Sequence, residues 1–275
     1  MYARAFLRFN LLSVLLVAIF AIKAHAVVGV LEIQTRTSVR VESDLVKVDV
    51  VITNNGDGPA YNLQVHLNIL GQEQDAPIKP RLDPGRSDTV IFEKSVPGVK
   101  KGRYPLTVYV DFHDANHYPF SALSGMTFHI DKDVNPDLVP LANDLIIAKS
   151  GKLRFEIKNL GLRSKKVQTS LVLPKELSSP RPKISLQLDP RSERAIDFEI
   201  SNFSALPGAS YPVFCYFEYD LEDTHHTAVA GAVIRIADEE NWFQRTRWLW
   251  TALAGVLCVA LVAVIIKERR KRTVP

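Results

Sequence analysis

The chain repeats one pattern, so that residues 45–130 can be laid beside residues 151–236. The two copies lie about 106 residues apart, and their matching features occur in the same order. The matches include Ile52-Thr53-Asn54-Asn55-Gly56 with Ile157-Lys158-Asn159-Leu160-Gly161, Leu82-Asp83-Pro84 with Leu188-Asp189-Pro190, and Tyr104-Pro105 with Tyr211-Pro212. A repeat of this length predicts two structurally similar units in tandem.

Apolar and polar residues alternate within each copy, which is the period of a strand with one buried face. The apolar positions are Val46, Val48, Val50 and Ile52; Tyr61, Leu63, Val65, Leu67 and Ile69; Leu106, Val108, Val110 and Phe112; Leu153, Phe155 and Ile157; Val213, Cys215, Phe217 and Tyr219. Turn sequences such as Asp83-Pro84-Gly85 separate these runs. About seven short strands in roughly 100 residues are typical of an immunoglobulin-like sandwich.

These patterns predict an all-β fold of two tandem immunoglobulin-like β-sandwich domains, followed by one C-terminal transmembrane helix. We place domain 1 at residues 27–132 and domain 2 at residues 133–237. The polar segment at the boundary contains Pro136, which disfavours helix at Asn135 and indicates a short linker. Two domains in limited relative motion would follow.

The segment 248–266 is the predicted membrane anchor. Its apolar part, residues 249–266, would span about 27 Å as a helix, close to the roughly 30 Å of a bilayer's hydrocarbon core. Trp248 and Trp250 lie where an interfacial aromatic belt is expected. A basic cytoplasmic tail, residues 267–275, follows with Lys267, Arg269, Arg270, Lys271 and Arg272. Cytoplasmic flanks carry the excess of lysine and arginine, so everything before the anchor is predicted to lie outside the cytoplasm.

The N-terminus predicts the same topology. Residues 1–26 have the charges and apolar core of a signal peptide, and Ala24 and Ala26 supply the small-x-small pattern of a cleavage site. An uncleaved signal anchor is the alternative, and either interpretation keeps residues 27–247 outside the cytoplasm. Residues 238–247 are interpreted as a juxtamembrane stalk, with a partner-docking segment as the alternative.

The net charge of +4 and the pI of about 9.0 arise from these terminal segments. Three of the 34 basic residues lie in residues 1–26, and five lie after Arg247 together with one of the 30 acids. The remaining 26 basic and 29 acidic residues leave the segment between them slightly acidic. The composition therefore gives no electrostatic reason to expect nucleic-acid binding.

Two cysteines are present, Cys215 between the termini and Cys258 in the predicted anchor, so no disulfide is expected within residues 27–247. Cys215 lies on the inward side of its alternating run, which predicts a buried apolar role. A reactive or subunit-linking thiol is the alternative. About 220 residues are enough for two ordinary apolar cores.

The segment Ile52-Thr53-Asn54-Asn55-Gly56-Asp57-Gly58-Pro59-Ala60-Tyr61-Asn62-Leu63 resembles the strand-turn-strand of bacterial surface β-sandwich domains of the CARDB, NEW3 and DUF11 kind. The Asn-x-Gly turn recurs at Asn159-Leu160-Gly161, although the Gly-Pro-Ala part is replaced by Leu162-Arg163-Ser164-Lys165. The resemblance implies an extracytoplasmic immunoglobulin-like module associated with adhesion or with presenting other domains. It brings no catalytic residues. The overall layout also resembles translocon-associated membrane subunits of eukaryotes.

Candidate metal ligands lie near the ends of two matching strands. They are His113, Asp114 and His117 in the first copy, and Asp223, His225 and His226 in the second. Neither set has a recognised zinc spacing, and Asp111, Asp114 and Asn116 do not form a recognised calcium loop. GxSxG, P-loop and CxxC motifs do not occur. We therefore predict no metal, no cofactor and no catalytic residues, and an enzyme is not expected.

The sequence thus predicts a structural, adaptor or adhesion-type protein of a bacterial inner or cytoplasmic membrane. A protein partner in the envelope or membrane is expected to bind through sheet edges and loops. The alternative is a membrane-tethered module that binds envelope polysaccharide, with Tyr109 and Tyr118 offering rings on which a sugar could stack. A translocon-associated accessory subunit is a further alternative.

Overall fold

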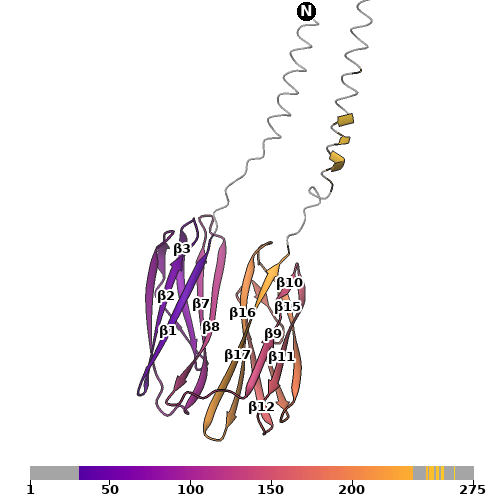
Figure 1. Cartoon of the computed structure of the whole chain (residues 1–275). Helices are drawn as coiled ribbons and strands as arrows, with labels where there is room; N and C mark the ends of the chain where they lie inside the picture. The colour runs from indigo at the N-terminus through magenta and orange to yellow at the C-terminus, as the bar shows by residue number, and fades with distance from the viewer. Residues whose placement is uncertain are drawn as a thin grey trace, which may run out of the picture.

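The computed structural model describes residues 31–237, and beyond them residues 246, 248–250, 252–253, 255–256 and 263. Between residues 31 and 237 the chain forms strands, turns and loops, and no helix. Figure 1 shows the strands as two bundles lying side by side. The predicted all-β fold is therefore confirmed for this part of the chain.

The first half contains eight strands on two sheets. Their bounds are β1 (Ile33–Glu42), β2 (Leu45–Asn54), β3 (Ala60–Ile69), β4 (Gln72–Asp75), β5 (Lys79–Leu82), β6 (Ser87–Ser95), β7 (Gly102–His113) and β8 (Pro119–Ile130). One sheet has the order β1-β2-β6, and in the other β3 pairs with β4, β5 and β7 while β8 pairs with β7. All these pairings are antiparallel.

The second half repeats this arrangement. Its strands are β9 (Leu138–Ala142), β10 (Leu145–Ile147), β11 (Ser150–Asn159), β12 (Lys165–Val172), β13 (Leu177–Ser178), β14 (Lys183–Leu188), β15 (Glu193–Asn202), β16 (Ser210–Leu221) and β17 (Thr224–Ile236). One sheet has the order β13-β15-β11-β9, and the other runs β14-β12-β16-β17, with β10 added in parallel to β17.

Each half encloses its own hydrophobic core between its two sheets. The first core extends from Val46 to Ile130 and the second from Leu138 to Ile236. In β2 every second residue is buried, as a strand with one face on a core requires. The inward positions predicted for β7, β11 and β16 are buried as well, including Cys215 at 0% exposure. Cys215 thus lies inside the second core, and burial raises the pKa of its thiol well above the usual value.

The predicted alternation is wrong at the start of β3. Tyr61 was expected to point inward, but Ala60 and Leu63 are buried there, and the Tyr61 ring lies 5.6 Å from the Arg81 guanidinium carbon. The pairing of β3 with β7 shifts register between Tyr61 and Gln64, and Asn62 has a φ of 51° in the left-handed region. This irregularity adds a residue to the strand and reverses the face of everything before it.

Asn54 closes the corner at the end of β2 from a completely buried position. Its side-chain amide nitrogen donates to the carbonyl oxygens of Gly58 at 2.9 Å and Leu82 at 3.0 Å. Its side-chain oxygen accepts from the backbone nitrogen of Gly56 at 3.0 Å. One asparagine therefore satisfies three backbone groups that the turn leaves without strand partners.

Asn159 has the same role in the second half, and it too is completely buried. Its amide nitrogen donates to the carbonyl oxygens of Arg163 and Asp189, both at 2.9 Å, and its oxygen accepts from Gly161 N at 3.0 Å. The Asn-x-Gly motif found in both copies thus marks one shared structural device.

The segments predicted for targeting fall mostly outside the described residues. These are the signal peptide 1–26 with Ala24 and Ala26, the tail 267–275, and residues 238–245 and 247 of the stalk. Trp248 and Trp250 are described as helical, and they are 67% and 47% exposed. Among the described residues no helix has both the length and the apolar character needed to cross a membrane.

Candidate binding site at the junction of the two halves

The two halves meet through the outward faces of β7 and β8 in the first and β16 and β17 in the second. Tyr216 alternates with the inward residues of β16, so its side chain points away from its own core. It is buried against the first half instead. Its hydroxyl donates to Leu106 O at 2.7 Å and lies 3.0 Å from Thr107 Oγ1. Burial raises the pKa of Tyr216 to about 12. The junction is therefore a packed, hydrogen-bonded interface.

Glu176 forms a second contact across the junction. It is only 3% exposed, and its carboxylate accepts hydrogen bonds from the backbone nitrogen of Ser121, at 2.7 Å, and from the Ser121 hydroxyl. The Glu176 backbone oxygen accepts from Phe203 N at 2.9 Å. Buried carboxylates are costly unless their oxygens are satisfied, so these bonds fix β8 against the second half.

Two glycines allow the halves to come this close. A Cβ atom on Gly125 would lie 2.6 Å from Phe214 Cγ and 2.7 Å from the Tyr216 hydroxyl. A Cβ atom on Gly102 would lie 2.1 Å from the backbone oxygen of His225, where β7 and β17 form one parallel bridge. These positions leave no room for any side chain.

His225 joins the charged end of the junction. Its ring stacks on Tyr104 with the centroids 4.4 Å apart and the planes at 11°. Its two nitrogens lie 2.7 Å from Asp220 Oδ1 and 3.3 Å from Glu218 Oε1. Lys100 of the first half completes the group, with Nζ 3.1 Å from Asp220 Oδ2.

This geometry predicts a pH-dependent stability. Burial by itself lowers the pKa of His225, but the hydrogen bonds to Glu218 and Asp220 outweigh it and raise the pKa. A raised folded-state pKa gives stability that is complete below the unfolded value of about 6.5 and is lost as pH rises through the folded value. We therefore expect His225→Gln to destabilise the protein more at about pH 5.5 than at about pH 8.5 in urea unfolding.

The exposed His129 on β8 provides the control. His129→Gln should change stability little, with no such difference between the two pH values. A His225→Gln effect that is equal at both pH values would contradict the assigned ion pairs.

A groove of about 950 Å³ lies beside the junction and is walled by both halves. Its lining is mostly apolar. The first half contributes Ile33, Phe112, Tyr118, Phe120 and Leu123, among others. The second half contributes Pro174, Leu206, Tyr211, Pro212 and Phe214.

The aromatic wall of the groove is held by ring contacts. Phe112 and Phe120 stack with centroids 5.7 Å apart, and Tyr118 lies 5.2 Å from Phe120 at 60°. The Tyr118 hydroxyl donates to Ser204 O at 2.9 Å, which ties this wall to the second half. Leu206 remains 38% exposed on the opposite side. The groove therefore presents apolar surface that the two halves leave open.

The structure separates the histidines that the sequence suggested as ligands. His117 is exposed in a turn in which Asp114 Oδ1 accepts from the backbone nitrogens of Asn116 and Tyr118, both at 2.8 Å, so that carboxylate is used by the turn. His113 Nδ1 is buried without a hydrogen-bond partner among the described residues.

The second set is divided in the same way. His225 belongs to the junction, His226 stacks on Tyr219 at 4.8 Å, and Asp223 is exposed in the turn before them. Burial lowers the pKa of His226.

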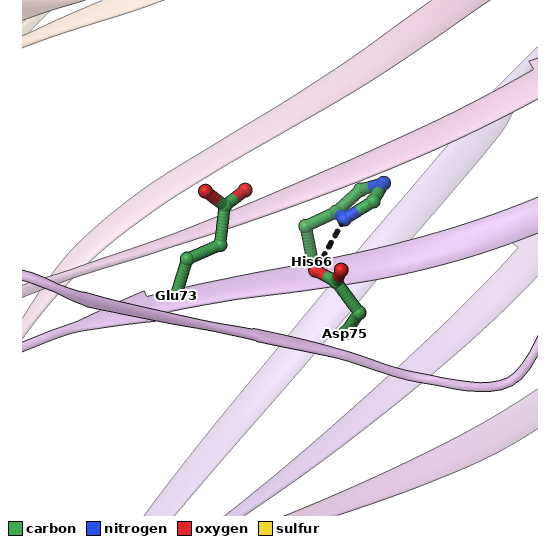
Figure 2. Close-up of side chains that lie close together, drawn as sticks. All are labelled: His66, Glu73 and Asp75. Carbon is green, nitrogen blue, oxygen red and sulfur yellow. Dashed lines mark hydrogen bonds and ion pairs between the residues drawn. The ribbon is translucent and has the colours of Figure 1, made fainter.

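Within the described residues, metal-binding side chains come together elsewhere, at His66, Glu73 and Asp75 (Figure 2). The sequence alone does not bring this group together, because its members lie on two strands whose register local patterns do not fix.

The tyrosines suggested for sugar stacking do not share a surface. Tyr109 is partly buried on β7, and burial together with the charge of Glu73 raises its pKa to about 12. Tyr118 lines the groove and is 36% exposed.

The predicted topology residues Lys267, Arg269, Arg270, Lys271 and Arg272 lie outside the described residues.

The fold and the junction define the class as an all-β protein in which paired sheets enclose two cores. Residues 27–115 match the CARDB family model. This match confirms the resemblance found in the turn around Asn54. None of the curated proteins compared with the chain matches it significantly.

Solved structures show distant similarity. Escherichia coli α2-macroglobulin in its native conformation has a TM-score of 0.30 and 12% identity, over 75% of this chain and 17% of that one. A red sea bream transglutaminase has a TM-score of 0.27 and 12% identity, over 74% and 31%. Salmonella α2-macroglobulin reacted with methylamine has a TM-score of 0.27 and 9% identity, over 74% and 16%. The matches thus span between 16% and 31% of those chains.

Proposed function

We propose that this chain is a non-enzymatic, single-pass membrane protein whose two tandem immunoglobulin-like domains bind a protein partner outside the cytoplasm. The two separate cores support the division into two domains. The apolar run 249–266 and the basic tail after it support an anchor in a bacterial inner or cytoplasmic membrane, with the C-terminus in the cytoplasm. The signal-like residues 1–26 support export of the domains.

The groove at the junction is the observation that carries this proposal. It combines an aromatic wall from the first half with apolar residues of the second. Its lining also includes polar residues, among them Glu32, Asp114 and Asn116. Apolar surface combined with a smaller share of polar groups is typical of a protein-recognition surface. We assign the groove to an apolar segment of a partner protein that lies in the same membrane or envelope.

The ring geometry favours a peptide over a sugar. A sugar platform needs exposed rings that offer flat faces, but the planes of Tyr118 and Phe120 are tilted by 60°. Rings tilted against each other offer both edges and faces, against which apolar side chains can pack. Carbohydrate binding therefore remains the alternative, and it makes a different prediction in the experiment below.

A non-catalytic role is supported by how the charged groups at the junction are used. Glu176 accepts from Ser121, and His225 is held between Glu218 and Asp220. Glu176 thus contacts the first half directly, and so do His225, which stacks on Tyr104, and Asp220, which pairs with Lys100. None of the side chains of Glu176, Glu218, Asp220 and His225 lines the groove.

Leu206→Asp tests the groove in the full-length, C-terminally tagged protein, purified from gently solubilised native membranes. We expect the variant to lose a stoichiometric membrane partner that the unaltered protein retains, because a charge cannot be buried in an apolar contact without a large cost. A photo-crosslinking side chain at Tyr118 should form an adduct with the same partner.

Leu162→Asp is the matched control, because Leu162 is 77% exposed in a turn and does not line the groove. This variant should keep the partner. A partner retained by both variants would exclude the groove as its site. A protein that purifies alone and binds envelope polysaccharide as well without its anchor would instead support the carbohydrate alternative.

A further inference from the structure

We propose that the hairpin of β3 and β4 carries a zinc site, with His66, Glu73 and Asp75 as the protein ligands. The ligand atoms of these three side chains lie within 4.8 Å of one another. The site is separate from the junction groove, whose lining includes none of the three residues. It therefore does not depend on the function proposed above.

The hairpin fixes the three side chains on one face. A two-residue turn, Leu70-Gly71, joins the strands, and both residues have positive φ, 53° and 71°, as the tightest hairpin turns require. In the resulting register His66 lies directly opposite Asp75. Glu73 is two residues from Asp75, so strand alternation places both carboxylates on the same face as the imidazole. Figure 2 shows the Glu73 carboxylate and the His66 ring rising from the same side of the hairpin.

The outer surroundings of His66 match those of a metal-binding histidine. Its Nδ1 lies 2.7 Å from Asp75 Oδ1, while Nε2 lies 3.0 Å from Asp111 Oδ2 on the neighbouring strand β7. Metal-binding histidines usually donate their second ring N–H to a carboxylate, which fixes the tautomer and the ring orientation. Asp111 is placed to do this, and the lone pair of Nδ1 would then face Asp75, where the ion would bind.

Asp111 also has one oxygen, Oδ1, that is buried without a hydrogen-bond partner among the described residues. This carboxylate lies on the Nε2 side of the His66 ring, away from an ion at Nδ1, so Oδ1 is a position expected to hold an ordered water. Lys175 of the second half contacts Oδ2 and offsets part of the local negative charge.

The donor set favours zinc over the hard cations. One imidazole nitrogen and two carboxylate oxygens are common zinc ligands, whereas calcium and magnesium take oxygen ligands only. Ligand atoms around tetrahedral zinc lie about 3.3 Å apart, which follows from bond lengths of roughly 2.0–2.2 Å. The Nδ1 to Asp75 distance must widen slightly, and the exposed Glu73 must turn inward. A water molecule would complete the four ligands.

The simpler alternative is an ion pair, in which a protonated His66 bridges Asp75 and Asp111 without metal. Titration of the full-length protein in mild detergent, without a polyhistidine tag, distinguishes the two. Zn²⁺ affinity is measured by competition with a chromophoric chelator, and Co²⁺ is added separately to observe the visible absorption of a tetrahedral site. We expect one Zn²⁺ per chain, with no competition from excess Ca²⁺.

The variants have graded expectations. His66→Ala should weaken Zn²⁺ binding by about 100-fold or more, and Asp111→Asn by about 10-fold to 100-fold because it acts through His66. Glu73→Gln and Asp75→Asn, at exposed positions where folding is not at risk, should each weaken it by about tenfold or more. His129→Ala, an exposed strand histidine on β8, is the matched control and should leave binding unchanged.

Two results with Zn²⁺ itself would overturn the zinc site. One is the absence of stoichiometric Zn²⁺ binding, which would leave the ion pair as the role of the group. The other is Zn²⁺ binding that survives in the Glu73→Gln and Asp75→Asn variants with unchanged affinity. Binding of Ca²⁺ in preference to Zn²⁺ would equally contradict it.

Discussion

Gly102→Ala should undo the docking of the two halves. The new Cβ atom would lie 2.1 Å from His225 O and 2.7 Å from His225 N, and the φ of +143° is one that alanine rarely adopts. The atoms in the way are backbone, so they cannot move aside as a flexible side chain would. We expect a loss of about 3 kcal/mol or more in the free energy of unfolding, because the chain must shift one half against the other.

Urea unfolding and limited trypsin digestion measure this effect together. Undocking should free the linker to move and so speed cleavage after the exposed Lys132. Gly58→Ala is the control, because a Cβ atom there meets nothing within 4 Å, and it should change stability by no more than about 0.5 kcal/mol. Equal digestion of Gly102→Ala and the unaltered protein would show that the contact between the halves does not depend on this close approach.

Asn54→Ala and Asn159→Ala should each destabilise the half in which they lie. Either change removes at least three hydrogen bonds to backbone groups, one of them to a buried carbonyl oxygen, Leu82 O or Leu188 O. A buried group left unsatisfied costs about 1–3 kcal/mol and each other lost bond about 0.5–1.5 kcal/mol, so we expect a loss of about 3 kcal/mol for each variant. Urea unfolding followed by fluorescence or circular dichroism measures the change.

Asn55→Ala separates the corner bonds from general effects on the turn. Asn55 is exposed, and its amide bonds only the side chain of Gln34 among the described residues. Its loss should cost less than about 1 kcal/mol. If the Asn54→Ala variant were no less stable than Asn55→Ala, the corner hydrogen bonds would not be stabilising the fold.

The strands and their inward faces could be predicted because alternation is local information. Val46, Val48 and Val50 are buried as predicted, and so are Phe155 and Ile157 in the second copy. The Asn-x-Gly motif predicted a turn that both copies share. The CARDB resemblance rested on that same segment and is confirmed over residues 27–115.

The prediction failed where one residue changed the register. Asn62, at positive φ, shifts the pairing of β3, so Tyr61 turns outward although its neighbours alternate correctly. The group around His66 depends on register in the same way. The two-residue turn Leu70-Gly71 sets His66 opposite Asp75. A turn one residue longer or shorter would shift the register and separate them.

The anchor, the signal peptide and the localisation remain predictions. They rest on residues such as Ala24, Ala26 and Lys267 that lie outside the described part of the chain. A protease-protection assay on sealed membrane vesicles would establish the side on which each terminus lies.

The sequence by itself determined that this protein consists of strands, that their inward faces repeat in two copies, and that an Asn-x-Gly turn recurs in each. These properties follow from residues close together in the chain. Only the tertiary structure decided how the halves meet, because docking depends on outward residues of distant strands. Tyr216 bonds Leu106, and Glu176 bonds Ser121. These residues are too far apart in the sequence for a local pattern to predict that they meet. The groove exists only because those contacts hold the two halves side by side.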